Sequence, residues 1–587
     1  MLCELYRSRQ NVPRCATMMY SGFVKQAANL RGWQLQADGV SLESLTLSNS
    51  LAGATTTEED QEEHSAPLWT THSSQPHHCV PASTDTAHTA AVSGDTVLIQ
   101  RSSDTEQSHQ CMSKRAQNEL GRVALMYLNR KQVLIPTSAL SSECRNAACS
   151  IGLLVESNTG IGNVLHSQAK PCVYFVHYSL QEYFAAQYLC ADPEHAQAVR
   201  ECARDGYGVG EETAPFWAFV CGSATSKQLA EIISILKSAM LEHGRTVANA
   251  TRSLLSYFME HVNTRPTLAE QAMLGSCTSE ETSYLSKAVD SIAADGLRLV
   301  NVQLGMSDVL ALQCVHDHAT TIKLLNLTGC NLTAEKCNIL TLSKAEELQL
   351  GVNPCSASLV EMAARSLSCP GSKVRNLWLD TCNLSACTYP ALLACVQAKN
   401  LQGLRLLNNK ELGNGFLEYL QQTLYSDCQL TFLNLRHVGL TAGCGSQLAA
   451  LITKLPQLQR LSMSGNNLSN SDLEQVLAAL NTNVIGIVWV AGNDLDDAIV
   501  PAICEFYQRK NGKQQQHSSA NTSQAVQNGH TCHVKLQGCN VTREGLETIA
   551  TAQCLSRGDQ VFTGLHFVNS DGVGERDLRQ QLLQTSG

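Results

Sequence analysis

The residues of this chain that come closest to a catalytic set are His177, Ser179 and Glu182, within the stretch FVHYSLQEYFAAQYL. Serine, histidine and a carboxylate are the side chains of nucleophilic hydrolases. Their spacing of two and three residues, across a change of hydrophobic period, disfavours a triad, and no G-x-S-x-G motif surrounds the serine. We instead predict a capping box, in which Ser179 caps a helix and Glu182 returns to the amide of Ser179.

The sequence motifs give little support for phosphoryl transfer or for a metal site. The only Gly-Lys pair, Gly512-Lys513, lacks the other residues of a P-loop, and no magnesium-binding acidic strand is evident. The chain as given is therefore not expected to hydrolyse ATP. His77-His78-Cys79 has no second ligand pair nearby, so a zinc site is the weaker of two explanations for the cysteines. The favoured explanation is reduced thiols, many of them serving as small buried residues.

Composition sets wider limits. The 587 residues include 25 cysteines, 43% hydrophobic residues and 16% charged residues, with a net charge of −10, so a packed globular protein is expected. The acidic balance gives no bulk signature for nucleic acid or an anionic membrane. No run of eighteen apolar residues and no apolar signal core are present. We predict a cytoplasmic protein without catalytic or metal residues.

Two kinds of element must position the His177 stretch. Val173 and Phe175 belong to a β-prone run, and helical spacing begins after Ser179. An apolar helix over 119–128 and strand-like pieces at 133–135 and 152–156 precede it, the order typical of a winged helix. The predicted regions are a helical remnant at 1–51, a disordered insertion at 52–112, a winged-helix-like domain at 113–192, a helical domain at 193–295 and repeats at 296–587, with a polar insert at about 508–530.

The second half of the chain repeats the template L-x-x-L-x-L-x-x-N/C-x-L. Successive copies begin at positions 345, 374, 401, 430, 458 and 485, which leaves room for a helix after each strand. A weaker copy, with Leu297, precedes the array, and another, with Phe562, Leu565 and Phe567, follows it. This pattern predicts an α/β leucine-rich-repeat solenoid (horseshoe). Hydroxyl residues at the expected helix starts are predicted N-caps: Thr333, Ser356, Ser385, Thr441, Ser469 and Thr542.

The combination resembles the NOD-like receptors, which join a NACHT nucleotide switch to leucine-rich repeats. FVHYSLQEYFAAQYL resembles that family's F-x-H-x-S-x-Q-E-[FY]-x-A-A signature, and MLCELYRSRQNVPR with MMYSGFV resembles the preceding helical segment. The resemblance covers the C-terminal portion of such a receptor without its P-loop. It implies that His177 contacts a phosphate of ADP. The alternative is that His177 satisfies a polar group at a strand–helix junction. ADP or ATP is expected as a cofactor only if a nucleotide-binding half lies upstream.

The concave face of the repeats is the predicted partner-binding surface. By two-residue alternation, the residue between the last two core positions of each repeat points away from the core. Tryptophan and arginine are typical interface anchors. The predicted binding residues are Trp378, Arg405, Phe432, Arg436, Arg460 and Trp489. The alternatives are ordinary exposed repeat surface, or a surface covered by the chain's own helical region.

Three functions are compatible with these features. The first is a non-catalytic recognition protein of NOD-like-receptor type, whose repeats bind a protein partner or a microbial ligand and whose helical region couples binding to innate immune signalling, with oligomerisation as one route. The second is an ATP/ADP-dependent switch with its P-loop half upstream. The third is a simple repeat scaffold or inhibitor of ribonuclease-inhibitor type.

Overall fold

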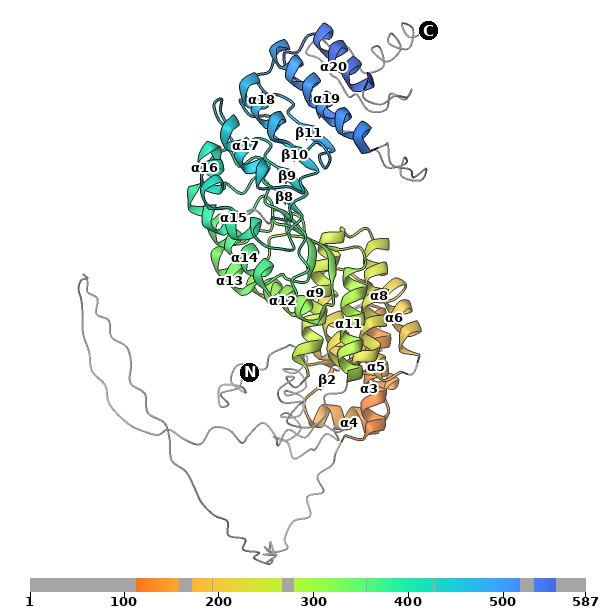
Figure 1. The fold of residues 1–587 in the computed structure, drawn as a ribbon. Coiled ribbons are helices and arrows are strands. Elements are labelled where there is room, and N and C mark those ends of the chain that lie inside the picture. The colour runs from red at the N-terminus through yellow and green to blue at the C-terminus, as the bar shows by residue number, and fades with distance from the viewer. Residues whose placement is uncertain are drawn as a thin grey trace, which may run out of the picture.

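The structure is a computed structural model that describes residues 112–157, 171–192, 194–265, 279–354, 356–425, 428–517 and 533–555. The described chain forms a helical block followed by a curved array of repeats (Figure 1). One cluster of buried hydrophobic side chains extends from Met112 to Ile549. The predictions for residues 1–51, for most of the 52–112 insertion, for His77–Cys79 and for the repeat copy at Phe562 lie outside the described residues.

The N-terminal part packs helices against a small antiparallel sheet with strand order β1-β3-β2. Val173 of the central strand pairs with Ile135 on one side and Glu156 on the other. The alternation of the strands buries Val173 and Phe175 against the helices. The elements are α3 (Lys114–Asn129), β1 (Ile135–Pro136), α4 (Ser142–Ser150), β2 (Leu154–Ser157), β3 (Cys172–Phe175) and α5 (Tyr178–Ala191).

The predicted capping box at the start of α5 is wrong. The helix begins at Tyr178, so the N-cap is His177, whose extended backbone (φ −144°, ψ 139°) precedes the first turn. The His177 Nδ1 atom accepts a hydrogen bond from the Ser179 amide at 3.2 Å. Glu182 therefore lies in the second helical turn and turns inward, where it is only 2% exposed. The helix begins two residues earlier than predicted, which moves Ser179 and Glu182 out of the cap and third helical positions.

Between the small sheet and the repeats, the elements of the described residues are helices. They are α6 (His195–Arg204), α7 (Ala214–Ser223), α8 (Ser226–Glu242), α9 (Val247–Asn263) and α11 (Ser279–Ala293). The apolar stripe of α8, which includes Leu229, Ile233 and Met240, is buried, and a Thr225–Gln228 capping box starts that helix. Figure 1 shows these helices bundled beside the first repeats.

In the described part of the chain, the repeats form one parallel sheet of nine strands in sequence order. Figure 1 shows the strands lining the inner side of the curve and the helices the outer side. The predicted solenoid is confirmed. Its strands are β4 (Leu297–Arg298), β5 (Ile322–Asn326), β6 (Ala345–Gln349), β7 (Asn376–Trp378), β8 (Gly403–Arg405), β9 (Phe432–Asn434), β10 (Arg460–Ser462), β11 (Ile487–Trp489) and β12 (His533–Lys535). Its helices are α12 (Met306–His318), α13 (Ala334–Ile339), α14 (Ser356–Ser368), α15 (Tyr389–Val396), α16 (Gly413–Thr423), α17 (Gly445–Thr453), α18 (Asn470–Ala479), α19 (Val500–His517) and α20 (Arg543–Leu555).

Asparagine or cysteine at the ninth repeat position links neighbouring turns. Buried Asn466 accepts hydrogen bonds from the amides of Val438 and Leu440, both at 3.1 Å, and donates to the carbonyls of Leu435 and Met463. Asn353, Asn409 and Asn493 make similar contacts. The thiols of Cys330, Cys382 and Cys539 donate to carbonyls of earlier repeats instead. These side chains satisfy backbone groups that the strand-to-helix turns leave unpaired.

The helix starts agree only in part with the predicted hydroxyl caps. Ser469 forms a capping box with Asp472, and Thr542 accepts from the Gly545 amide. Thr333 and Ser385 occupy N-cap positions without a side-chain cap bond, whereas Ser356 is already the first residue of α14. Thr441 is wrong as a cap, because α17 begins later, after Cys444. Helix α19 runs to His517 and so includes the first part of the predicted polar insert.

The helical block is fixed to the first repeat by polar and aromatic contacts. Arg252 of α9 holds Asp308 of α12 through two nitrogens, at 3.0 and 2.8 Å. The Phe258 ring of α9 packs edge-on against His318, with centroids 5.6 Å apart. Because α12 also closes the repeat core, the sheet and the helical block share one hydrophobic interior. None of the helices in the described ranges is long and apolar enough to cross a membrane.

Candidate functional site

Strand register places the outward residues of the repeats in rows across the concave face. The central row consists of residues that are direct partners in the pairing of neighbouring strands. Its members are Arg298, Asn326, Gln349, Trp378, Arg405, Asn434, Ser462, Trp489 and Lys535. A second row, one pleat earlier on each strand, contains Phe432 and Arg460. Three of the six predicted binding residues thus share the central row and two share the second.

Trp378, Arg405 and Asp380 form a closed cluster within this face. The Arg405 guanidinium lies 4.8 Å from the centre of the Trp378 ring, and its Nε is 2.8 Å from Asp380 Oδ2. The other Asp380 oxygen accepts from the Leu407 amide. Burial raises the pKa of Asp380, and the neighbouring Arg405 partly offsets that rise. The cation of this cluster is already neutralised within the chain.

Phe432 and Arg460 form a second stacked pair, with the guanidinium 4.8 Å from the ring centre. The Phe432 ring lies over the buried backbone of Gly403 on the neighbouring strand, 3.6 Å from where a Cβ would be. Arg436 is exposed and lies two residues after β9. Its backbone amide donates a hydrogen bond to the Asn434 side chain. Aromatic stacking pre-orders Arg460 without neutralising its charge.

The predicted surface is broader than one contact patch. Trp378 and Trp489 stand on β7 and β11, four strand spacings apart, which corresponds to about 19 Å along the sheet. Trp489 is flanked in its row by Ser462 and Lys535 rather than by the two stacked pairs. The concave face therefore holds one neutralised cluster around Trp378 and a more open cationic area around β9 to β12.

His177 lies at the junction of β3 and α5, where its side chain is exposed. Its Nδ1 accepts from the Ser179 amide, so the neutral ring carries its proton on Nε2. The contact in the structure is thus the polar satisfaction of a strand–helix junction. A phosphate contact of His177 stays a prediction, because one donor without a glycine-rich loop does not make a phosphate cradle.

Replacement of His177 by alanine removes the cap of α5 and is expected to lower the unfolding free energy by about 1 kcal/mol. The measurement is denaturant unfolding of the purified chain, and titration with ADP tests the implied phosphate contact. ADP binding that is lost in His177→Ala would support that contact. Unchanged stability together with unchanged ADP binding would contradict both roles.

Glu182 was predicted to be part of a capping box, but it is a buried acid. The Tyr207 hydroxyl donates to Glu182 Oε1 at 3.1 Å, and the Tyr178 hydroxyl lies 3.0 Å from that of Tyr207. Burial raises the pKa of Glu182 to about 7, and the hydrogen bond from Tyr207 limits this rise. Burial also raises the pKa of Tyr207. No short motif links residue 207 to the signature, so only folding brings these groups together.

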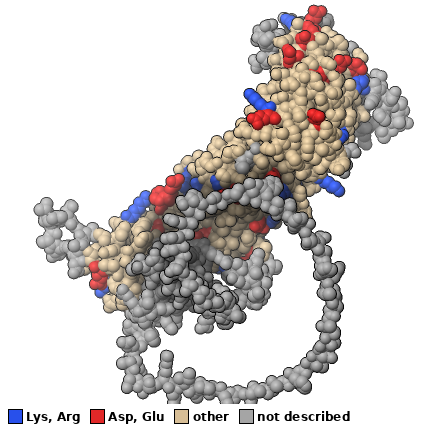
Figure 2. Space-filling model, turned by 90° about the vertical axis from the view of Figure 1, so that its left-hand side faces the viewer, with Lys and Arg blue, Asp and Glu red and all other residues tan. Residues whose placement is uncertain are grey.

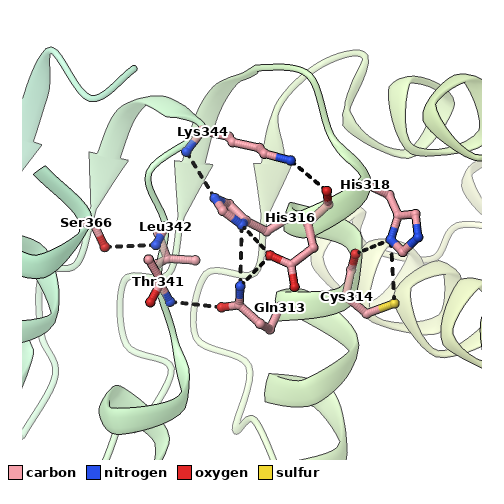
Figure 3. A network of polar contacts seen from close by, with 9 residues as sticks. Gln313, Cys314, His316, His318, Thr341, Leu342, Lys344 and Ser366 are labelled. Carbon is pink, nitrogen blue, oxygen red and sulfur yellow. Dashed lines mark hydrogen bonds and ion pairs between the residues drawn. The ribbon is translucent and has the colours of Figure 1, made fainter. Parts of the chain in front are cut away.

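A second network that no motif predicts lies where α12 meets the repeats (Figure 3). His316 Nε2 accepts from the Lys344 amide at 3.0 Å, and its Nδ1 lies 3.2 Å from Asp317 Oδ1. Burial lowers the pKa of His316. Cys314 is 4.0 Å from His318, but burial raises the pKa of that thiol to about 12. A thiol held neutral is not a nucleophile, so the network is structural.

The cysteines in the described ranges are free thiols, and most of them are buried. Burial raises the pKa of several of them to about 12, among them Cys190, Cys202 and Cys395. Within those same ranges, no three histidine, cysteine, aspartate or glutamate side chains are grouped as metal ligands.

Comparison with known proteins identifies leucine-rich-repeat relatives. The chain is 30% identical over 176 residues to ribonuclease inhibitor of Sus scrofa (29% of this chain, 38% of the relative) and 30% identical over 191 residues to that of Mus musculus (31% and 42%). It is 26% identical over 221 residues to NACHT, LRR and PYD domains-containing protein 9B of Mus musculus (36% and 22%). No family model matches.

The chain thus spans less than half the length of each of these relatives. Its homologues are ribonuclease inhibitor and NACHT, LRR and PYD domains-containing proteins, in agreement with the predicted resemblance to NOD-like receptors. Among solved structures, a chain in a crystal structure of the Rad7 and Elc1 complex in yeast matches 56% of this chain at 12% identity. Its TM-score of 0.25 is too low to support an argument.

Proposed function

We propose that the concave sheet face of the repeats binds a protein partner, and that the chain is a non-catalytic recognition protein of NOD-like-receptor type. The observation that carries this proposal is the set of aromatic and cationic side chains in two adjacent rows between Trp378 and Trp489. Arg405 and Arg460 are each pre-ordered by stacking on a ring. Pre-ordered side chains lose less conformational entropy when a partner binds, which favours affinity.

The outer face of the array contrasts with this concave face. Helices α15 and α17 contain no aspartate, glutamate, lysine or arginine. Figure 2 looks towards this outer side, and its visible repeat surface carries only scattered charges. Because charge steers a partner and fixes its register, the concave side is the better candidate for specific recognition. A relative named for inhibition of a ribonuclease supports binding of a protein there.

The helical block supports a coupling role. We propose that α3 to α5 and the small sheet act as a winged-helix-like unit in the cytoplasm, which transmits binding to innate immune signalling. The Arg252–Asp308 pair and the shared core join the helical block to the first repeat. A displacement of the repeats on partner binding would therefore be transmitted to the block. This arrangement favours a regulatory protein over a repeat scaffold with an unused N-terminal half.

The variants Trp378→Ala and Trp489→Ala are expected to weaken a captured protein partner by about thirtyfold each, because each removes a large anchor worth about 2 kcal/mol. The partner is captured with the purified full chain, identified, and its dissociation constant is measured by biolayer interferometry. Tyr425→Ala is the matched control, since Tyr425 is an aromatic residue that is 73% exposed and lies after α16, away from the sheet. Wild-type affinity in both tryptophan variants would overturn the proposed function.

A further inference from the structure

Ser462 at the end of β10 and Ser464, two residues beyond it, are unusual polar groups on the concave face. Ser462 and Ser464 alternate with Leu461 and Met463, whose side chains are in the core, so both hydroxyls point to the concave side. Each serine is nevertheless only 5% exposed. Among the described residues, neither hydroxyl has a hydrogen-bond partner. Taller side chains on the neighbouring strands therefore flank Ser462 and Ser464, and the space above the two serines and between those side chains is called the recess.

Strand pairing identifies the walls of this recess. In the row of Ser462, the neighbours are Asn434 on β9 and Trp489 on β11. The ladder continues beyond the strands, since the His437 amide donates to the Ser464 carbonyl and the Gly465 amide donates to the Ala491 carbonyl. Arg436 therefore stands at the β9 side of Ser464, whereas small Ala491 extends the floor on the other side. Arg460 closes the recess from the same strand.

The charges around the recess are not balanced within the described chain. Arg405 is held by Asp380 at 2.8 Å, but Arg436 and Arg460 have no carboxylate partner among the described residues. Both are exposed. Two exposed guanidinium groups and the hydroxyls of two serines, each residue only 5% exposed, thus border the recess. All of them can donate hydrogen bonds, and the guanidinium groups also supply positive charge.

This donor set fits a carboxylate. An aspartate or glutamate side chain could accept from both hydroxyls while facing the two guanidinium groups, and Trp489 offers an apolar wall for the chain that carries it. A long polyanion fits less well, because Glu347 of β6 and Asp380, two residues after β7, occupy the same concave face. A ligand whose negative charge is local rather than continuous is therefore favoured, which is a protein segment and not a nucleic acid.

We propose that the recess over Ser462 and Ser464, rimmed by Arg436, Arg460 and Trp489, receives an aspartate or glutamate side chain from an acidic segment of a partner protein. This inference rests on the proposed function and adds the chemistry of the partner. The carboxylate takes hydrogen bonds from the serine hydroxyls, and the arginines neutralise its charge. The Trp378 cluster, already neutralised by Asp380, then serves as a contact surface without selecting for charge.

The test uses the full chain and a fluorescein-labelled peptide of alternating glutamate and alanine, with binding measured by fluorescence anisotropy at low ionic strength. The double variants Ser462→Ala/Ser464→Ala and Arg436→Gln/Arg460→Gln are each expected to weaken binding about tenfold, since each removes charge-assisted hydrogen bonds. The control Lys323→Gln/Arg375→Gln removes two exposed cations outside the recess and should change affinity less than about twofold.

Equal weakening in the control would show attraction by bulk charge and would overturn the recess as a site. Wild-type binding by the serine double variant would also overturn it. Tighter, recess-dependent binding of an oligothymidylate would replace the protein partner by nucleic acid. If binding of a captured partner still depends on Trp489 but peptide affinity is unchanged in the recess variants, the inference fails and the proposed function stands. If both tryptophan variants retain that partner fully, the proposed function fails.

Discussion

Asn466→Ala is expected to lower the unfolding free energy by about 3 to 5 kcal/mol, because truncation leaves several buried backbone groups without partners. The asparagine oxygen accepts from Val438 and Leu440, and its nitrogen donates to Leu435 and Met463. No water can replace these contacts easily, since Asn466 is only 5% exposed. The loss falls on the junction of two repeats, where nearest-neighbour contacts carry the stability of a solenoid.

Asn467→Ala is the matched control, because Asn467 is the adjacent residue and is exposed. It should change the unfolding free energy by less than about 0.5 kcal/mol. Denaturant unfolding gives the free energies, and hydrogen exchange locates the loss. Protection should fall first for amides between Leu435 and Leu468 in Asn466→Ala. Equal stability of the two variants would contradict the role of the asparagine ladder.

Glu182→Gln is expected to stabilise the chain at pH 8 by about 1 to 3 kcal/mol relative to the unmodified protein. Burial raises the pKa of Glu182 from 4.5 to about 7, so ionisation of this carboxyl opposes folding. A glutamine keeps an oxygen for the Tyr207 hydroxyl but cannot ionise. The substitution therefore removes the cost of a buried charge and keeps the shape of the site.

The direction of the pH effect follows from proton binding. Between pH 4.5 and about 7 the folded chain keeps a proton on Glu182 that the unfolded chain has released. The contribution of the protonated carboxyl is fully present below pH 4.5 and is lost as the pH rises through about 7. In Glu182→Gln this fall in stability should disappear, which chemical denaturation at a series of pH values measures.

Glu201→Gln removes one negative charge from the exposed surface of α6 and serves as the control for net charge. Its pH profile should keep the slope of the unmodified protein. A slope in Glu182→Gln identical to that of the control would show that Glu182 does not titrate between folded and unfolded states. It would also remove the buried acid as a reason for pH-dependent stability.

Several outcomes show how far local sequence rules reach. The repeat template correctly predicted the parallel strands, because each leucine position is set by a two-residue alternation that local spacing reveals. The predicted Ser179–Glu182 box failed because the helix begins two residues earlier than predicted, and helix ends are the least certain part of such a prediction. Thr441 failed because α17 begins later, after Cys444.

By itself, the sequence determined the solenoid, the outward residues of its strands and the relationship to leucine-rich-repeat proteins. Those properties depend on periodic patterns within about 29 residues, as in the step from 345 to 374. Only the tertiary structure decided that Asp380 neutralises Arg405, that the Tyr207 hydroxyl donates to buried Glu182 and that Ser462 and Ser464 are only 5% exposed. The physical reason is that partners and burial arise between elements, where distances in space are independent of distances along the chain.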